Sequence, residues 1–596
     1  MITVMLIWLY VIITTYLVGY SFLKMMSSWP GMATLKNGIV KKYKTHFRES
    51  YIVTGIVVVT VFSEIFSIFQ GVGLKANIIL ILYCVVAAVY YREELLEDLQ
   101  DMHHVLSSNL DGIFYILIFL LMAYGTSHGI MHYDSDLYHA QAIHWIEDYG
   151  IVKGLGNLHV RLAYNSASFA LSALYSMAFL GGQSYHVMAG FFALLLAWQC
   201  LDIKNVVRRG HIVLSDFARV AAIYYLFTIY DEMVAPASDY FLQTMVFYTI
   251  IHWLDMYVRH EKSYVPYIQL TMLGVYAVTI KLSAAPMVLL AIIPIYMLFH
   301  DRTKEKMKAF GISILLVLFI VLPFLTRNVI ISGWVLYPVT ILDFFGFDWE
   351  IPKGVAEFDA LEIKTFGRGY NDVTNYGHVT MKEWVPHWFS SLSMMNKAMV
   401  VLALVAIVIY IVCFLYFLLA ASERKTHKLN NKVFEISHRS MLNLADFLTI
   451  GATLIGCMIF WFMSAPLIRY GIVYVWLVVA VIFGRMFILL SNRVDKKAKD
   501  YMLKVFVALL ALWIVFKGIN LIRDEYPRFN AKYFLAQQDY GTYETKTFDI
   551  SKVTFYYPAE GDQIGYGPFP AATHDLSEEM EFIGKNIHDG FKPKGK

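Results

Sequence analysis

The chain has 596 residues, of which 58% are hydrophobic and 16% are charged. Soluble domains contain about 25% charged residues, so a chain this apolar could not cover a globular surface with polar groups. The net charge of +3 gives no basis for binding nucleic acid. The four cysteines lie in apolar stretches, which excludes a disulfide framework or a cysteine metal site.

Apolar runs long enough to cross a bilayer recur along the whole chain. A helix needs about 20 mostly apolar residues to cross the hydrocarbon layer. About fourteen runs meet this need, at residues 2–23, 51–69, 75–91, 112–128, 185–201, 213–231, 239–257, 264–280, 284–300, 308–326, 397–418, 446–463, 467–490 and 502–522. The sequence therefore predicts an all-α integral membrane protein of about fourteen transmembrane helices.

Lys and Arg residues gather in alternate connections, and such residues favour the cytoplasm. Residues 24–50 are basic, as are the later loops near 204–209, 302–308, 424–439 and 485–499. This alternation predicts that both termini lie outside. The outside segments are then residues 129–184, 327–396 and 523–596.

Three regions follow from this topology. Residues 1–111 form a three-span extension with a cytoplasmic amphipathic helix at 92–111, residues 112–490 form the transmembrane core, and residues 491–596 form the last span and an outside tail. The segment 164–181 is also apolar, but counting it as a span would invert the charge pattern downstream. We therefore expect an interfacial or re-entrant helix there.

The first outside loop carries the densest group of reactive side chains, in the stretch GIMHYDSDLYHAQAIHWIEDYG. Asp134 and Asp136 open a short amphipathic helix. One Asp would suffice as an N-cap, so the second carboxylate is a candidate catalytic base. No metal site is expected, although a divalent cation at Asp134 and Asp136 stays open. Tyr138, His139 and His144 are candidates for contact with a sugar or acceptor.

Other charges lie at the predicted outer ends of spans, whereas the span interiors are nearly free of charge apart from Glu64. Asp239 follows another outside turn and is a further catalytic candidate. Lys281, Arg327 and Arg469 each lie on the outer side. Any one of them could simply snorkel to the interface, but together they suit a phosphate or diphosphate.

The second outside loop, 327–396, interleaves aromatic residues with carboxylates. Trp349 and Trp384 are candidates for stacking on sugar rings, and the alternative is an interfacial aromatic belt. The tail from Tyr526 onward is rich in Gly, Pro and Tyr. It is too irregular for a large core, so we expect it to drape over the outside loops.

The acidic motif in the first outside loop, the second acidic turn and the edge arginines resemble those of the C-type (GT-C) integral membrane glycosyltransferases. The stretch YDSDLYHAQAIHWIEDYGIVKGLGNLHVRLAYNSASF is similar to an uncharacterised bacterial branch of that superfamily. The resemblance extends over roughly residues 112–490 and implies a GT-C-like fold.

The resemblance also implies a function. Such enzymes transfer a sugar from a polyprenyl phosphate or diphosphate to a glycan, lipid-linked or protein acceptor, here at the outer face of a bacterial cytoplasmic membrane. By analogy, Asp134 or Asp136 occupies the catalytic position, Asp239 the second acidic turn, and Arg469 a phosphate contact. Inversion would follow from a single displacement with an Asp base.

Two other functions compete with this interpretation. A flippase or transporter of a lipid-linked saccharide would rely on charge inside the bundle, with Glu64 as the candidate. A polysaccharide polymerase or ligase would place its site in the loop 327–396, with a residue such as His387.

Overall fold

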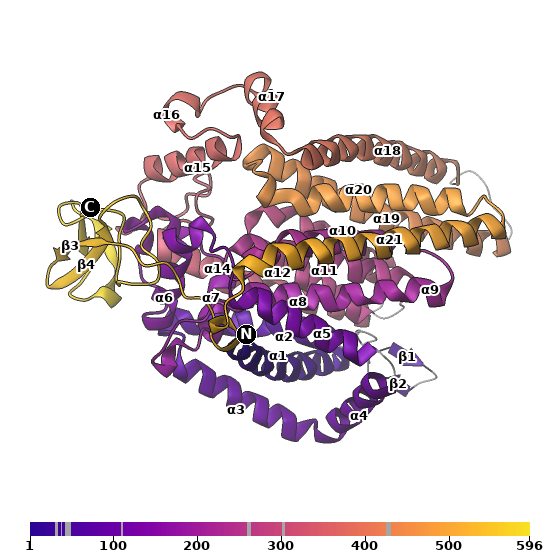
Figure 1. The fold of residues 1–596 in the computed structure, drawn as a ribbon, viewed down its shortest axis with the longest axis horizontal. Helices are drawn as coiled ribbons and strands as arrows, with labels where there is room; N and C mark the ends of the chain where they lie inside the picture. The colour runs from indigo at the N-terminus through magenta and orange to yellow at the C-terminus, as the bar shows by residue number, and fades with distance from the viewer. Residues whose placement is uncertain are drawn as a thin grey trace.

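The computed structural model describes residues 1–29, 32, 34–36, 39–41, 49–108, 111–258, 264–300, 304–424 and 431–595. Most of this chain is helical, and the long helices run along the longest axis of the molecule (Figure 1). Within these residues, nine helices are long and apolar enough to cross a membrane: Ile2–Ser28, Glu49–Phe69, Met188–Arg209, Leu282–Phe299, Lys306–Ser332, Met394–Tyr416, Asp446–Ser464, Ile468–Ser491 and Lys496–Arg528. Each coincides with a predicted span.

The other five predicted spans are helical but do not meet the same test. Two of them are short, since α5 (Asp111–Ser127) and α12 (Tyr264–Ile280) have 17 residues each. α3 (Leu74–Tyr90) meets the test only when it is joined to the start of α4 (Arg92–Ser108), the predicted amphipathic helix, from which it is bent by 85°. The number of fourteen spans is therefore not confirmed.

The last two, α10 (Leu214–Thr228) and α11 (Ser238–Val258), carry charges that pair with each other inside the protein. The guanidinium of Arg219, which is 1% exposed, donates to Asp255 at 2.5 Å. A burial of this kind shows that apolar runs also arise in helices enclosed by protein.

The helix bundle has two distinct ends (Figure 1). α6 (Ala140–Asp148), α15 (Lys353–Gly367) and the strands β3 (Thr545–Ile550) and β4 (Val553–Pro558) lie at one end. α9 (Asn205–Arg209) and the hairpin of β1 (Thr34–Lys36) and β2 (Ile39–Lys41) lie at the other. We call the first the tail end and the second the basic end. Parts of the predicted basic loops, at 42–48, 301–303 and 425–430, lie outside the described residues.

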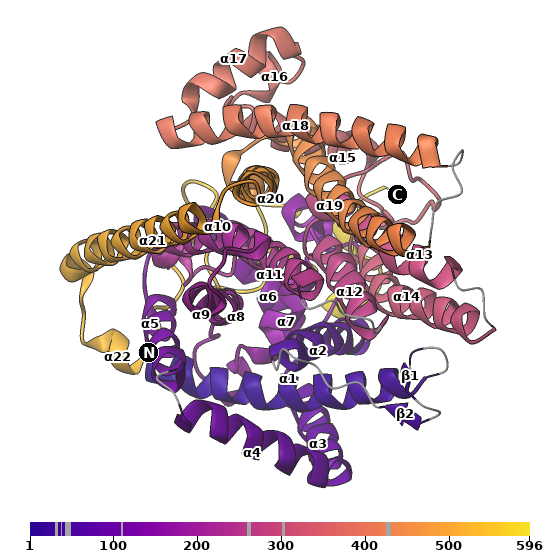
Figure 2. The same ribbon diagram turned by 90° about the vertical axis from the view of Figure 1, so that its right-hand side faces the viewer.

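The remaining helices complete the bundle and its loops: α1 (Ile2–Ser28), α2 (Glu49–Phe69), α7 (Ala167–Tyr175), α8 (Met188–Cys200), α13 (Ile292–His300), α14 (Lys304–Ser332), α16 (Val373–Tyr376), α17 (Met381–Ser391), α18 (Met394–Arg424), α19 (Asn431–Ser464), α20 (Ile468–Ser491), α21 (Lys496–Glu525) and α22 (Lys532–Leu535). α1 packs along α2 in the interior, whereas α21 runs along the outside and has no buried residue (Figure 2).

The segment 164–181 contains the nine-residue helix α7, in which every residue is buried. Nine residues span only about 14 Å, about half of the hydrocarbon layer. Its Ser166 side chain caps the helix by accepting from the backbone N–H of Ser168. The helix is therefore enclosed at the tail end and does not cross as a span of its own.

The tail contains ordered strands as well as draped loops. β3 pairs with β4, and β5 (Met580–Phe582) pairs with β6 (Phe591–Pro593), both antiparallel. Their inward side chains make a small aromatic core of Phe548, Phe555, Phe582 and Phe591, all buried. Over its described residues the tail thus has a small core and no large one, and it lies against the first outside loop. The strands themselves were not predicted, because strands this short carry too weak an alternation to stand out in sequence.

Candidate active site

Four of the predicted side chains, from segments far apart in sequence, form one cluster. Nη2 of Arg469 lies 3.0 Å from Oδ2 of Asp134, and its Nε lies 3.4 Å from Oδ2 of Asp239. The ammonium of Lys281 donates to the other carboxylate oxygen of Asp239. Two carboxylates and two cations thus alternate in the order Asp134, Arg469, Asp239, Lys281. We call this group the Asp134 cluster.

Each member of the cluster lies at a break between helices. Asp134 directly precedes the short helix η1 (Ser135–His139), and its side chain makes no capping hydrogen bond. Lys281 separates α12 from the 3-10 helix η7 (Leu282–Ala291), and Arg469 follows the break between α19 and α20. Asp239 lies in the first turn of α11. The N-cap explanation therefore fails for Asp134, whose carboxylate faces the cations.

Tyr470 and His132 complete the cluster. The ammonium of Lys281 lies 3.7 Å from the centre of the Tyr470 ring, within the range of a cation–π contact. Nδ1 of His132 lies 3.5 Å from Oδ2 of Asp134. Neither residue was singled out in the sequence, although Tyr470 adjoins Arg469.

The cluster borders a cavity of about 410 Å³. Asp134, Tyr138, Lys281 and Tyr470 line its polar part. Apolar side chains line another part of the wall, among them Phe324, Val339, Phe460 and Met463. A cavity that combines charged groups with an apolar wall suits an amphiphile with a polar head.

Asp134 is a carboxylate that its surroundings hold in the ionised form. Burial alone would raise the pKa of Asp134, but the guanidinium groups of Arg469 and Arg161 nearby hold that pKa below its ordinary value. Burial lowers the pKa of His139 to about 3, so this imidazole is neutral. Asp134 is therefore ionised at neutral pH, and His139 packs against the rings of Tyr138 and Phe169.

Asp136 has a different set of partners, all from the tail. Its carboxylate accepts from the backbone N–H of Gly541 at 3.1 Å and from the Tyr543 hydroxyl at 3.0 Å. Its backbone oxygen accepts from the N–H groups of Ile564 and Gly565. Asp136 thus binds the tail and does not face the cavity.

His144 and Glu147 also bind the tail. The His144 ring is stacked between Tyr566 and Phe569, with centroids 4.0 and 3.8 Å away. The carboxylate of Glu147 accepts from the Tyr566 hydroxyl at 2.5 Å. One face of α6 therefore packs against the tail. His144 lies on that face and does not reach the cavity.

Arg327 lies apart from the Asp134 cluster. Its side chain is 1% exposed and donates to Asn165 at 2.9 Å and to Ser67 at 2.6 Å. Glu64, the candidate of the transporter hypothesis, is buried in α2 and interacts electrostatically with Arg327. The cavity wall includes Asn165 but neither of these charges.

The aromatic candidates of the second outside loop also lie outside the cavity. Trp349 stacks on Phe347 and donates to the Val329 carbonyl. Trp384 is buried, and the Cζ atom of the Arg368 guanidinium lies 4.8 Å from the centre of the Trp384 ring. His387 stacks on Tyr370 in the same loop. Of the predicted sugar-binding side chains, only Tyr138 lines the cavity.

In the part of the chain that the structure describes, no group of three or more His, Cys, Asp or Glu side chains is arranged to hold a metal ion. The two carboxylates that left a divalent cation open have separate partners, Arg469 for Asp134 and the tail for Asp136. They do not converge on one point as a pair of ligands would.

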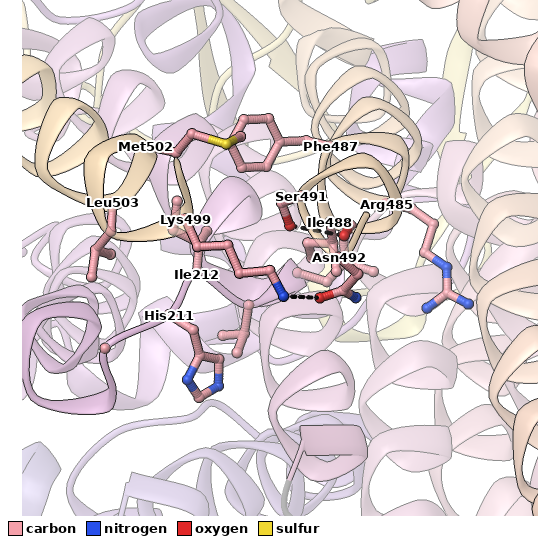
Figure 3. Close-up of a pocket in the computed structure, with 13 residues that line it drawn as sticks. His211, Ile212, Arg485, Phe487, Ile488, Ser491, Asn492, Lys499, Met502 and Leu503 are labelled. Carbon is pink, nitrogen blue, oxygen red and sulfur yellow. Dashed lines mark hydrogen bonds between the residues drawn. The ribbon is translucent and has the colours of Figure 1, made fainter. Parts of the chain in front are cut away.

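A second cavity, of about 390 Å³, lies between the end of α20, the start of α21 and the start of α10. Figure 3 shows Lys499 hydrogen-bonded to Asn492 at 3.3 Å, with His211 beside them and Arg485 pointing away. Its lining includes basic and apolar residues but no carboxylate. It therefore offers no carboxylate base for activating an acceptor hydroxyl.

Sequence reasoning missed two basic side chains that line the first cavity, Arg161 and Lys364. The sequence offered no signal for either, because each lies in a long outside loop that holds other basic residues, such as Lys153 and Lys353. Asp359, one of several carboxylates in the second outside loop, was not singled out either. It is 2% exposed and accepts from the hydroxyls of Tyr164 and Tyr337, which line the cavity.

A family model described as a domain of unknown function (DUF8201) matches residues 1–476. The chain belongs to this family. The match includes all four members of the Asp134 cluster and the first three predicted spans, and it ends before the tail. Comparison with curated proteins gives no match.

Proposed function

We propose that this DUF8201 protein is a membrane glycosyltransferase of the GT-C type. It transfers a sugar from a polyprenyl phosphate or diphosphate to a hydroxyl group of a glycan, lipid-linked or protein acceptor, at the outer face of the cytoplasmic membrane. The observation that carries the proposal is the Asp134 cluster, in which the ionised carboxylate of Asp134 and the ammonium of Lys281 line a cavity with an apolar wall and Arg469 lies directly behind them.

In this proposal Asp134 is the general base. The acceptor hydroxyl gives its proton to the Asp134 carboxylate while its oxygen forms a bond to the anomeric carbon. The bond from that carbon to the phosphate oxygen breaks, and the lipid phosphate leaves with the electron pair. The product has the inverted configuration because there is a single displacement.

Arg469 and Lys281 serve the leaving group. Both cations are held by Asp239, which is 4% exposed, and both can approach the phosphate as its negative charge develops. Asp239 is then a positioning residue in the described geometry. The guanidinium of Arg469 offers the bidentate fork that suits a phosphate.

The experiment is transfer of sugar from a polyprenyl-phosphate donor in membranes that contain Asp134→Asn. We expect a loss of about 10²- to 10⁴-fold, the usual contribution of a general base. The matched control is Asp148→Asn, an exposed carboxylate on the neighbouring helix α6, with 53% of its side chain exposed. Its transfer rate should equal that of the wild type.

A transporter gives the opposite result. If Asp134→Asn keeps full transfer while Glu64→Gln abolishes movement of a lipid-linked saccharide, the enzyme proposal is wrong. The buried position of Glu64 next to Arg327 is the observation that keeps this alternative testable.

A further inference from the structure

The charges that line the cavity do not balance. Three basic side chains, Arg161, Lys281 and Lys364, face one acidic side chain, Asp134, around its wall. Lys281 is neutralised by Asp239, and Arg469 behind the wall is shared between Asp134 and Asp239. Arg161 has the carboxylates of Glu362 and of buried Asp359 as electrostatic partners, so within the described residues the uncompensated charge of the wall is that of Lys364.

Among the described residues, neither Arg161 nor Lys364 uses all of its N–H donors within the protein. Arg161 contacts Glu362 at 3.2 Å, but 42% of the Glu362 side chain is exposed, and ion pairs in solvent contribute little. Lys364 makes no ion pair among the described residues. Both groups are therefore available to an anion in the cavity.

The two cations line the same cavity, although Arg161 belongs to the first outside loop and Lys364 to the second. Arg161 belongs to η3 (Val160–Ala163), and Lys364 to α15, where it is two residues from Glu362. The Arg161–Glu362 contact joins the two loops. The cavity is thus assembled only when residues 160–164 and 353–367 fold together.

The apolar wall opens at the edge of the bundle. Phe460 and Met463, near the end of α19, line the cavity and are 42% and 53% exposed. α19 contains a candidate span, so this opening faces the region that lipid chains would occupy. A ligand with an anionic head and a long apolar chain satisfies both parts of the cavity.

We infer that Arg161 and Lys364 bind the phosphate of a polyprenyl phosphate whose chain leaves the cavity past Phe460 and Met463. This inference rests on the proposed function and deepens it, since it assigns the lipid phosphate to two residues outside the Asp134 cluster. Arg327, which is bonded to Ser67 and Asn165, takes no part in it.

Equilibrium binding of a radiolabelled polyprenyl phosphate to the full chain, in nanodiscs of uncharged lipid, tests this inference. We expect Lys364→Met and Arg161→Met each to weaken binding about tenfold, the effect of about 1.4 kcal/mol. The matched control is Lys353→Met on the same helix, an exposed lysine that does not line the cavity. It should bind like the wild type, and Lys364→Arg should restore most of the affinity.

Two further binding measurements distinguish a site for polyprenyl phosphate from a site for the lipid chain alone or for free phosphate alone. Polyprenol, which lacks the phosphate, should bind at least tenfold more weakly, and inorganic phosphate should not displace the lipid. Equal binding of polyprenol, displacement by inorganic phosphate, or wild-type affinity in both Lys364→Met and Arg161→Met would overturn the inference.

The two proposals fail separately. If Asp134→Asn binds the lipid normally and the wild type transfers no sugar, only the glycosyltransferase proposal fails. If transfer depends on Asp134 but lipid binding is indifferent to Lys364 and Arg161, only the phosphate site fails.

Discussion

Asp134 and Asp136 lie two residues apart in a helical segment, and their carboxylates have different partners because residues at i and i+2 of a helix do not face the same side. Asp134 faces Arg469 and the cavity, whereas Asp136 and Glu147 face the tail. Burial raises the pKa of Glu147 and that of Asp136 above their ordinary values. The attachment of the tail should therefore depend on pH.

A carboxyl group whose pKa is raised by folding binds a proton more tightly in the folded state. Its stabilising contribution is complete below the unfolded pKa and is lost as pH rises through the folded pKa. We expect limited proteolysis to cleave the tail faster as pH rises from about 4.5, the region of the ordinary Glu pKa, to neutrality. His186 beneath the tail has a pKa of about 4 and stays neutral over this range.

Glu147→Gln isolates this effect. The amide oxygen can accept from one of the two hydroxyls, of Ser184 or Tyr566, and the amide NH2 can donate to the other. The interface should therefore persist, but its dependence on pH should weaken. An unchanged pH slope in the variant would show that Glu147 does not control the attachment.

At the scale of elements, α1 and α2 pack with their backbones in contact at two glycines, Gly19 in α1 and Gly55 in α2. A Cβ atom at Gly19 would lie 1.8 Å from the Tyr51 carbonyl oxygen, and one at Gly55 would lie 1.8 Å from that of Thr15. Small residues allow helix backbones in membranes to approach closely. The first two spans therefore form a unit whose backbones touch.

Gly55→Ala should force α1 and α2 apart and lower the free energy of unfolding by about 1–3 kcal/mol, as overpacking does. The measurement is the thermal unfolding midpoint of the full chain in detergent. Gly518→Ala is the matched control, because Gly518 lies in α21 with no atom within 4 Å of the added Cβ. Equal midpoints for Gly55→Ala and the wild type would contradict the close contact.

At the scale of the whole molecule, the three predicted outside segments gather at the tail end and α9 lies at the basic end (Figure 1). This arrangement agrees with a membrane between the two ends. Exposed positions on each side, Gly182 and Glu560 at the tail end and Arg208 at the basic end, are suited to labelling.

With Cys413 replaced by serine and the three buried cysteines kept, we expect a membrane-impermeant maleimide to label Gly182→Cys and Glu560→Cys in intact cells. Arg208→Cys should react only after the membrane is permeabilised. Labelling of Arg208→Cys in intact cells would invert the topology and place the Asp134 cluster on the cytoplasmic side.

The amino-acid sequence alone determined the protein class and the general location of its reactive groups. Hydrophobic runs are local signals, so nine spans coincide with helices of sufficient length. The scarcity of charge also makes each outer charge conspicuous, which is why Asp134, Asp239, Lys281 and Arg469 stand out in the sequence without knowledge of their contacts. The count of fourteen is not confirmed, because helices such as α5, α10 and α12 are shorter than the runs suggested, at 17, 15 and 17 residues.

Only the tertiary structure decided which of these groups meet. Asp134 and Arg469 are 335 residues apart in sequence, and no local pattern encodes their contact. The same holds for Arg327, which turns inward to Asn165, and for Asp136, which meets a tail more than 400 residues away. Side-chain direction at a helix break depends on what packs against it, so the pairing of these charges was settled by packing and not by their spacing along the chain.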